Sequence, residues 1–153
     1  MVRLEMYEAG EREHLLNLPC PQFPSTPFSP PLSVGKARVC IISTAGLHPR
    51  ETEPFALGDI GYRPIPKDIA PNDLVMSHIS TNFDRTGYQR DLNTIFPLDR
   101  LKELAEQNRI DSVANYHYSF MGATDPTLME QSARGLAPLL KQDQVNSVLL
   151  VPV

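Results

Sequence analysis

Apolar residues along the chain form short runs that predict β-strands. Residues 37–43 and 146–152 each contain an apolar run without alternation, continuous from Val148 to Val151 in the second, which is the pattern of strands buried on both faces in a parallel sheet. Residues 73–79 and a stretch within residues 110–120 form shorter runs, and we expect a strand in each. The final run ends at Val153, at the carboxyl end of its strand, where α/β proteins place ligands and reactive groups.

Apolar residues at helical spacing predict helices around these strands. A short helix is expected within residues 5–18, and a second over residues 97–107, with Pro97 in its first turn. The apolar stripe of this second helix consists of Leu98, Leu101, Leu104 and Ala105.

A last helix is expected to begin with Asp125 as N-cap and Pro126 in its first turn. Gly135 and Pro138 weaken this helix, so an end or kink is expected near residue 137. Its predicted buried face consists of Leu128, Met129, Ser132, Leu136, Leu139 and Leu140.

The 15 prolines predict long ordered loops. Prolines between residues 19 and 31 predict an extended connector, because proline fixes φ and removes a backbone donor. Residues 49–71 have no sustained period but are too apolar for disorder, so an ordered loop is expected there. We therefore predict an α/β fold: a three-layer domain over residues 37–153 with a mostly parallel sheet and long Pro-rich loops, preceded by an arm over residues 1–36.

Composition narrows the class of protein. A chain of 153 residues is long enough for one domain, and its net charge of −4, without a Lys/Arg cluster, argues against nucleic-acid binding. No apolar run has the length of a transmembrane helix, and the N-terminus lacks the apolar core of a signal peptide. Two cysteines, Cys20 and Cys40, make neither a disulfide framework nor a metal knuckle. We expect a cytoplasmic protein with reduced thiols and no membrane contact.

Histidines and acidic residues lie in the predicted loops and strand ends. Histidines from different segments suit either a metal such as zinc, a substrate site, or a purely structural role; none of their spacings is diagnostic of a metal site. We expect no metal. The residues concerned are His48, Glu51, Glu53, His78, Asp84, Asp91 and His117.

Three other features have both a chemical and a structural interpretation. Arg63 lies on a rigid segment and suits a substrate carboxylate, or else it bonds carbonyls of its own loop. The turn at residues 44–46 resembles an anion-binding turn but lacks a nucleotide-binding motif. Cys40 lies in the middle of an apolar strand, where a free cysteine is usually a small core residue. Cys20 has no identifiable cation or helix N-terminus that would activate its thiol.

Six short motifs in order carry a family resemblance from about residue 37 onward. The chain resembles the selenoprotein B family of glycine/sarcosine/betaine reductases, in a compact form similar to the D-proline reductase selenoprotein subunit. The most specific motifs are DLNTIFPLDRL at 91–101 and HYSFMG at 117–122. The others are TAGLH at 44–48, EPF at 53–55, GYRPIP at 61–66 and SHI at 77–79.

The resemblance implies a redox residue directly after Val153. Family members carry a selenocysteine or cysteine after a strand that ends in a Pro-Val-type sequence, and a second cysteine usually follows. Selenocysteine is encoded by UGA, so we hypothesise that the 153-residue chain ends at that codon. The implied activity is reductive cleavage of a C–N bond of an amino acid or betaine by an oxidoreductase subunit. The chain without residue 154 is expected to be inactive, and no cofactor is expected beyond that selenocysteine or cysteine.

The resemblance also implies a site and partners. Loops 44–48, 63–66, 78–93 and 117–122 are expected to converge on the position after Val153. Expected partners are a small carboxylate substrate and other subunits of a reductase complex, in an oligomer, with the Pro-rich arm as one contact. A non-catalytic module that binds a small carboxylate or a partner is the first alternative, and a metal-dependent hydrolase using His and Asp residues is the second. The expected substrate-binding residues are His48, Arg63, His78, Asp91, Asn93 and His117.

Overall fold

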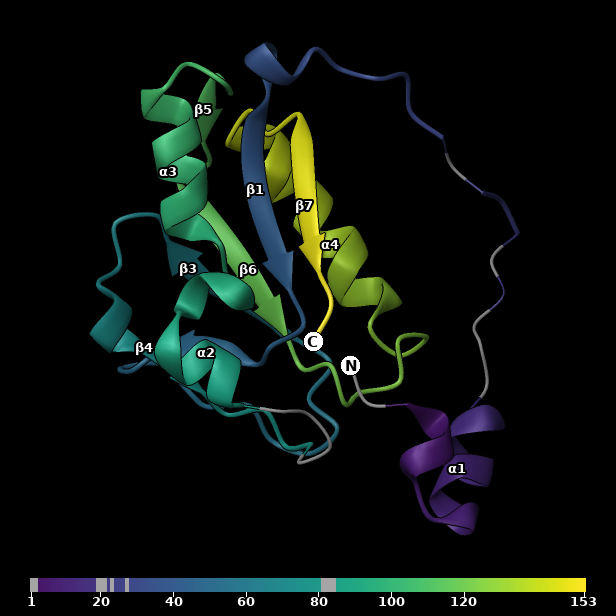
Figure 1. The fold of residues 1–153 in the computed structure, drawn as a ribbon. Helices are drawn as coiled ribbons and strands as arrows, with labels where there is room; N and C mark the ends of the chain where they lie inside the picture. The colour runs from purple at the N-terminus through teal and green to yellow at the C-terminus, as the bar shows by residue number, and fades with distance from the viewer. Residues whose placement is uncertain (1–2, 19–21, 23, 27, 81–84) are drawn as a thin grey trace.

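A central parallel strand organises the sheet. The computed structural model describes residues 3–18, 22, 24–26, 28–80 and 85–153. β1 (Arg38–Ser43) pairs in parallel with β7 (Ser147–Val151) along one side. Along its other side it pairs in parallel with β5 (Ser112–Val113) and β6 (Tyr116–Phe120). β3 (Tyr62–Pro66) extends the sheet beyond β6 in the antiparallel direction (Figure 1).

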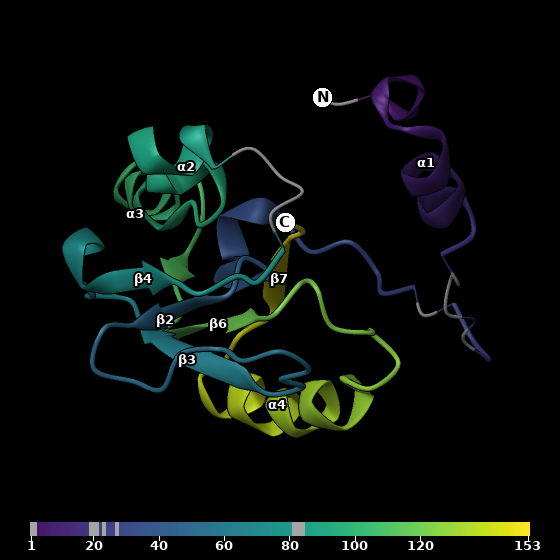
Figure 2. The same ribbon diagram turned by 90° about the horizontal axis from the view of Figure 1, so that it is seen from below.

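Helices cover both faces of this sheet, which confirms the α/β class. α4 (Glu130–Gln142) lies against one face, and α2 (Thr86–Arg90) and α3 (Leu98–Glu106) lie on the other side (Figure 2). A small antiparallel pair, β2 (Leu47–Pro49) with β4 (Leu74–Met76), lies on the same side as α2 and α3. Short 3-10 turns span Leu4–Met6, Val34–Lys36, Pro71–Asp73 and Leu92–Thr94.

Alternating side chains of β1 reach two separate apolar clusters. Ile41 packs with Phe96 and Leu101 on the α3 side, whereas Cys40 packs with Leu136 on the α4 side. Successive strand residues point to opposite faces, so a strand covered by helices on both faces must be apolar throughout. The predicted burial of residues 37–43 on both faces is therefore confirmed.

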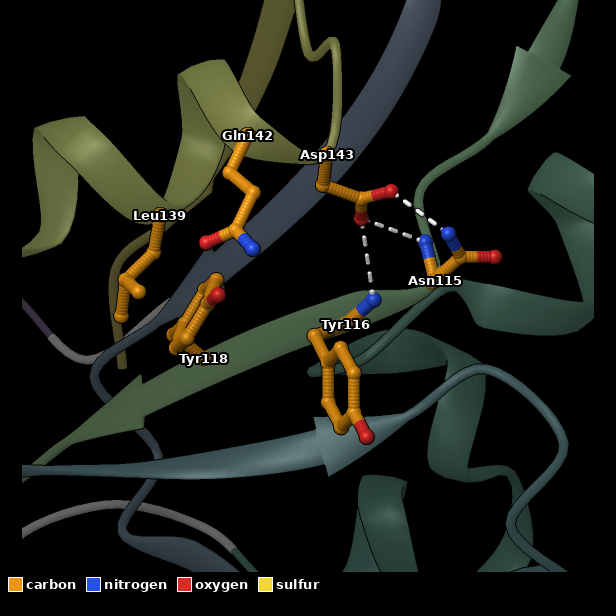
Figure 3. Close-up of a pocket in the computed structure, with 6 residues that line it drawn as sticks. All are labelled: Asn115, Tyr116, Tyr118, Leu139, Gln142 and Asp143. Atoms are coloured by element: carbon orange, nitrogen blue, oxygen red, sulfur yellow. Dashed lines mark hydrogen bonds between the residues drawn. The ribbon is translucent and has the colours of Figure 1, made fainter.

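An ion pair joins the amino end of the sheet to the end of α4. The Asp143 carboxylate accepts from Arg38 Nη2 at 2.6 Å and from the backbone N–H of Asn115 at 2.6 Å and of Tyr116 at 3.3 Å (Figure 3). Burial opposes its ionisation, but these hydrogen bonds outweigh burial and hold the pKa of Asp143 below its usual value. A cavity of about 320 Å³ opens beside it, lined by Asn115, Tyr116, Tyr118, Leu139, Gln142 and Asp143.

β7 is far more exposed than its apolar sequence predicts. Val148, Leu149 and Leu150 are 40%, 38% and 69% exposed, although Cys40 and Ile41 of the neighbouring β1 are fully buried. Among the described residues β7 pairs with β1 alone. The parallel pairing was predicted correctly, but the prediction of burial on both faces is wrong in this structure.

β3 lies within residues 49–71, where no regular structure was expected. Arg63 and Ile65 are paired with Ser119 and His117, and Lys67 N–H donates to the Asn115 carbonyl at 3.0 Å. The two prolines of the strand alternate with these residues, so their backbone nitrogens point away from β6. Their missing N–H groups therefore remove no hydrogen bond between the two strands. Proline in an outer strand is compatible with strand pairing. The strand was not predicted because its segment is rich in proline.

The last helix begins later than predicted and does not end near residue 137. Asp125 accepts hydrogen bonds from Thr127 N–H at 2.9 Å and Thr127 Oγ1 at 2.7 Å, so it stabilises a turn, and α4 starts at Glu130. The helix continues through Pro138 to Gln142. Leu136 of the predicted buried face is buried, whereas Leu128 is exposed.

The other predicted elements are present with small changes. α3 follows Pro97, which is its N-cap residue, and β4 occupies part of residues 73–79 but joins β2 rather than the main sheet. α1 (Ala9–Leu16) has no buried residue, and Cys20 and Asp84 lie outside the described residues. The division into an arm (1–36) and a domain (37–153) stays a prediction. No helix of the described part is long and apolar enough to span a bilayer.

Candidate functional site

The carboxyl ends of β1, β6 and β7 meet at one edge of the sheet. Thr44, directly after β1, donates its N–H to the Val151 carbonyl at 3.1 Å and accepts from Gly122 N–H at 2.9 Å. Gly46 N–H donates to the Phe120 carbonyl at 2.9 Å. Since the strands are parallel, segments far apart in the sequence are joined at this edge, as expected for a ligand site in an α/β fold.

The Thr44 side chain holds the backbone of Val153. Its hydroxyl oxygen accepts from Val153 N–H at 2.8 Å, and the same hydroxyl donates to the Val153 carbonyl at 3.2 Å. One side chain therefore satisfies both polar groups of this backbone unit. The position of Val153 is fixed by the loop that follows β1.

Gly122 is the point where three segments come closest together. A Cβ atom on this residue would lie 2.6 Å from the Val153 carbonyl oxygen, 2.8 Å from the Thr44 carbonyl oxygen and 3.0 Å from His78 Nε2. The first two atoms are backbone and cannot move aside without displacing their strands. Glycine is needed here because of this close approach.

His78 is placed by the loop after β4. Gly46 has a φ of +64°, and a Cβ there would lie 3.0 Å from both the backbone N and the Cα of His78. Ser77 N–H donates to the Gly46 carbonyl at 3.0 Å, and Arg85 Nη2 donates to the His78 carbonyl at 2.8 Å. Burial lowers the pKa of His78, the Arg85 charge lowers it further, and a hydrogen bond with the Ser80 backbone opposes them. The shift favours the neutral form of the His78 ring.

A mainly apolar cavity of about 300 Å³ lies next to Thr44. Phe120 of β6 and the first turns of α4 form most of its wall. The cavity is large enough for an amino acid or a small betaine. Its lining residues are Thr44, Phe120, Pro126, Met129, Glu130 and Ala133.

His117 and His48, which were expected to bind substrate, are buried elsewhere. His117 Nδ1 accepts from Ile41 N–H at 2.9 Å, and its ring meets Phe96 edge to face at 5.7 Å. Burial lowers the pKa of His117 to about 4, so the ring is neutral. His48 Nδ1 donates to the Pro49 carbonyl at 2.9 Å. Both rings have a structural partner within the fold.

Arg63 organises its own loop. Its guanidinium pairs with Asp59 at 2.6 Å, donates from Nε to the Glu53 carbonyl at 2.9 Å, and lies 4.4 Å from the centre of the Phe55 ring. Most donors of the guanidinium are therefore used within residues 53–62. Arg63 therefore bonds groups of its own loop, as in the second of its two interpretations. The geometry gives no support to its role as a carboxylate anchor.

Asp91 and Asn93 form the turn before α3. Asp91 accepts from the N–H and the side-chain amide of Asn93 at 2.9 Å each, and these hydrogen bonds lower the pKa of Asp91. Asn93 accepts from Asp99 N–H at 3.1 Å, at the start of the helix. Both residues are on the other side of the sheet from the cavity. Of the six expected substrate-binding residues, the structure brings only His78 to the strand ends.

The remaining sequence candidates also have structural roles. The N–H groups of the 44–46 turn donate to the Val151 carbonyl, Ser43 Oγ and the Phe120 carbonyl, so none is left for an anion. Burial raises the pKa of the Cys40 thiol to about 12, with the nearby Asp143 carboxylate adding to the effect, so this thiol is not a nucleophile. Within the described residues no three His, Cys, Asp or Glu side chains gather as metal ligands.

Comparison with known proteins adds an independent observation. Residues 3–153 match the family described as glycine/sarcosine/betaine reductase selenoprotein B. The chain belongs to this family. The match begins at residue 3, so the N-terminal arm is part of the selenoprotein B sequence, whereas the motifs alone had indicated a resemblance only from residue 37.

Curated relatives within this group are reductase subunits. D-proline reductase subunit gamma of Acetoanaerobium sticklandii is 32% identical over 115 residues, 73% of this chain and 47% of that protein. Glycine reductase complex component B subunit gamma is 24% identical over 146 residues in Symbiobacterium thermophilum, covering 86% of this chain and 32% of that protein. The Carboxydothermus hydrogenoformans protein of the same name is 23% identical over 141 residues, with 87% and 32% coverage. The chain spans about half the length of the first relative and about a third of the others. No solved structure matches it significantly.

The selenoprotein B motifs contained residues whose importance the sequence did not reveal. Thr44 opens TAGLH and Gly122 closes HYSFMG, yet neither was singled out as a site residue. Each follows a predicted strand at its carboxyl end, and that position was the available signal. Phe120 and Met129 were assigned to strand and helix cores, and their place in the cavity wall depends on how α4 lies on the sheet.

Proposed function

We propose that this chain forms part of a selenol- or thiol-dependent reductase subunit that cleaves a C–N bond of an amino acid or betaine. The observation that carries the proposal is the fixed backbone of Val153, held by Thr44 at the meeting point of three loops beside an apolar cavity. Membership of the selenoprotein B family and the names of the reductase subunits it resembles support this class of chemistry.

The redox residue is proposed to be residue 154, a selenocysteine or cysteine directly after Val153. Its selenolate or thiolate would supply the nucleophile that displaces the amine from the α-carbon of the substrate. Thr44 fixes the backbone from which such a residue extends, and Gly122, which has no side chain, lets its own loop lie directly against that backbone. Both residues position the reacting group without taking part in bond making.

His78 is proposed to orient the substrate. Its Nε2 lies 3.0 Å from the position that a Gly122 Cβ would occupy, next to the Val153 carbonyl. The lowered pKa favours the neutral ring, which donates from one nitrogen, accepts at the other and adds no positive charge to a site that binds an ammonium group. The cavity beside Thr44 is proposed to receive the apolar part of the substrate.

Two measurements test the proposal. The codon after Val153 is expected to be UGA or a cysteine codon, followed by an open frame with a nearby cysteine; UAA or UAG overturns the assignment of residue 154. With a dithiol reductant, the protein extended through this residue is expected to release amine from glycine, sarcosine or betaine, or to open the proline ring to 5-aminopentanoate. Its residue-154 serine variant and the 153-residue chain are expected to do neither.

The same assay separates catalysis from simple binding. A protein that binds the carboxylate substrate equally well with either residue at position 154, and releases no amine with either, is a binding module. Assembly with other reductase-complex subunits is also proposed, with the Pro-rich arm at residues 19–31 as one contact. Deletion of this arm is expected to weaken pairwise binding to such a subunit, and unchanged binding contradicts that role.

A further inference from the structure

The outer side of β7 is an apolar surface, formed by Val148, Leu149 and Leu150. Val148 and Leu150 pair with Cys40 and Ile42 of β1 and point to the α4 face, whereas Leu149 points to the α3 face. All three are exposed, at 40%, 38% and 69%. Side chains on both faces of β7 are therefore exposed to solvent.

The helices of the described part do not cover this surface. The cluster beneath α4 contains Leu136 and Leu140 but neither Val148 nor Leu150. The cluster beneath α3 reaches Val151 and Val153 but not Leu149. β7 also has no charged side chain, no proline and no bulge, which are the features by which exposed strands avoid pairing.

The shape of the surface defines what would cover it. An unpaired strand edge offers alternating N–H and C=O groups, so another strand completes its hydrogen bonds. Parallel strands of α/β proteins are joined by helices that cover the faces of the sheet, and such a helix would bury Val148 and Leu150. A strand together with its helix satisfies the edge and the face at once.

We propose that β7 receives a further parallel strand and its covering helix from the remaining part of the reductase subunit. The inference rests on the proposed function, because it takes this chain to be one part of such a subunit. The length of the relatives supports this occupant: the matched region is 47% of D-proline reductase subunit gamma and 32% of the two glycine reductase subunits. More than half of each relative is thus available to extend the fold.

The test is a complementation experiment that needs no enzymatic activity. The 153-residue chain is mixed with the part of A. sticklandii D-proline reductase subunit gamma that lies outside the match. The matched part of that protein serves as positive control. A one-to-one complex is expected, measured by light scattering, together with at least tenfold slower hydrogen exchange of the β7 amides.

Two variants connect binding to the surface. Leu150→Lys is expected to abolish the complex and to leave the melting temperature of the isolated chain unchanged, because Leu150 is already exposed. Leu57→Lys, at an even more exposed leucine outside β7, is expected to bind as the parent chain does.

Each other outcome overturns the proposal. The first is self-association of the 153-residue chain that protects the β7 amides in the absence of the A. sticklandii part. The second is a complex that still forms with Leu150→Lys. The third is a lack of any complex between the 153-residue chain and the A. sticklandii part, whether or not the two A. sticklandii parts bind each other. Loss of amine release alone would contradict the proposed function and leave this result unaffected.

Discussion

The hydroxyl of Thr44 binds both the N–H and the carbonyl of Val153, at 2.8 Å and 3.2 Å, across 109 positions of sequence. This contact places the end of one parallel strand against the loop after its neighbour. It provides a direct way to test whether the candidate site depends on a fixed backbone at Val153.

Replacing Thr44 with valine removes both hydrogen bonds and preserves the shape of the side chain. We expect a loss of about 1–2 kcal/mol in unfolding free energy, because a partly buried N–H and carbonyl lose their partner. The Val153 amide should exchange much faster, as measured by hydrogen exchange with NMR detection. Thr44→Ser keeps the hydroxyl and should retain most of the protection; equal exchange in all three proteins would contradict the role of Thr44.

Gly122→Ala places a methyl group against two backbone oxygens at 2.6 Å and 2.8 Å. We expect destabilisation of about 2–3 kcal/mol in urea unfolding, because neither strand end can move away freely. Gly135→Ala is the matched control, since it lies within α4 and a Cβ there meets nothing within 4 Å. That variant should be more stable by up to about 1 kcal/mol. Equal effects of the two substitutions would show that Gly122 has free space around it.

The buried His117 ring should make stability depend on pH. Its pKa falls from 6.5 to about 4 on folding, mainly through burial, so the unfolded chain binds the proton more readily. The contribution is complete above pH 6.5 and is lost as pH falls towards 4, in total roughly 3 kcal/mol. Urea unfolding at several pH values measures it.

His117→Gln should flatten this dependence, because glutamine does not titrate. Some slope should persist, since the pKa of His78 is lowered in the same direction. A variant with the same slope as the parent chain between pH 6.5 and 4 would show that His117 is not the group that titrates.

Asp143→Ala should be among the most damaging substitutions away from the site. It removes the carboxylate that pairs with Arg38 and accepts from the N–H groups of Asn115 and Tyr116, and the paired side chains are only 19% and 12% exposed. We expect a loss of about 3 kcal/mol, measured by thermal unfolding. Glu103→Gln breaks the exposed pair with Arg100 and should cost less than about 0.5 kcal/mol. Comparable losses for the two pairs would contradict this assignment.

The elements predicted well are those whose pattern is complete within the element itself. The residues by which β1 contributes to the two apolar clusters are apolar, and the apolar stripe of α3 is visible in the sequence of that helix alone. β3 was missed because its prolines oppose strand formation in general, and only the pairing of Arg63 with Ser119 shows that they face outward. The start of α4 was misplaced because Asp125 and Pro126 form a turn with the same local signals as a helix start.

The candidate site was harder to predict than the fold. The meeting of the β1, β6 and β7 ends follows from their parallel arrangement, whereas His78 was expected there from the family motifs and reaches these ends from the antiparallel β2–β4 pair. Arg63, Asp91 and Asn93 have chemically suitable side chains, but their partners are other residues of the same loops. Sequence gives the type of a side chain and its approximate place, whereas its occupied hydrogen bonds become visible only in three dimensions.

The outward prolines of β3 determine how copies of this sheet associate with one another. Pro64 and Pro66 deny a further strand two donors on that side, whereas the opposite side at β7 accepts one. Open-ended polymers need two complementary association surfaces on each molecule, and the described strands of this sheet offer a single free edge, at β7. Any self-association through β-pairing should therefore stop at a closed two-fold pair and should not grow into fibres.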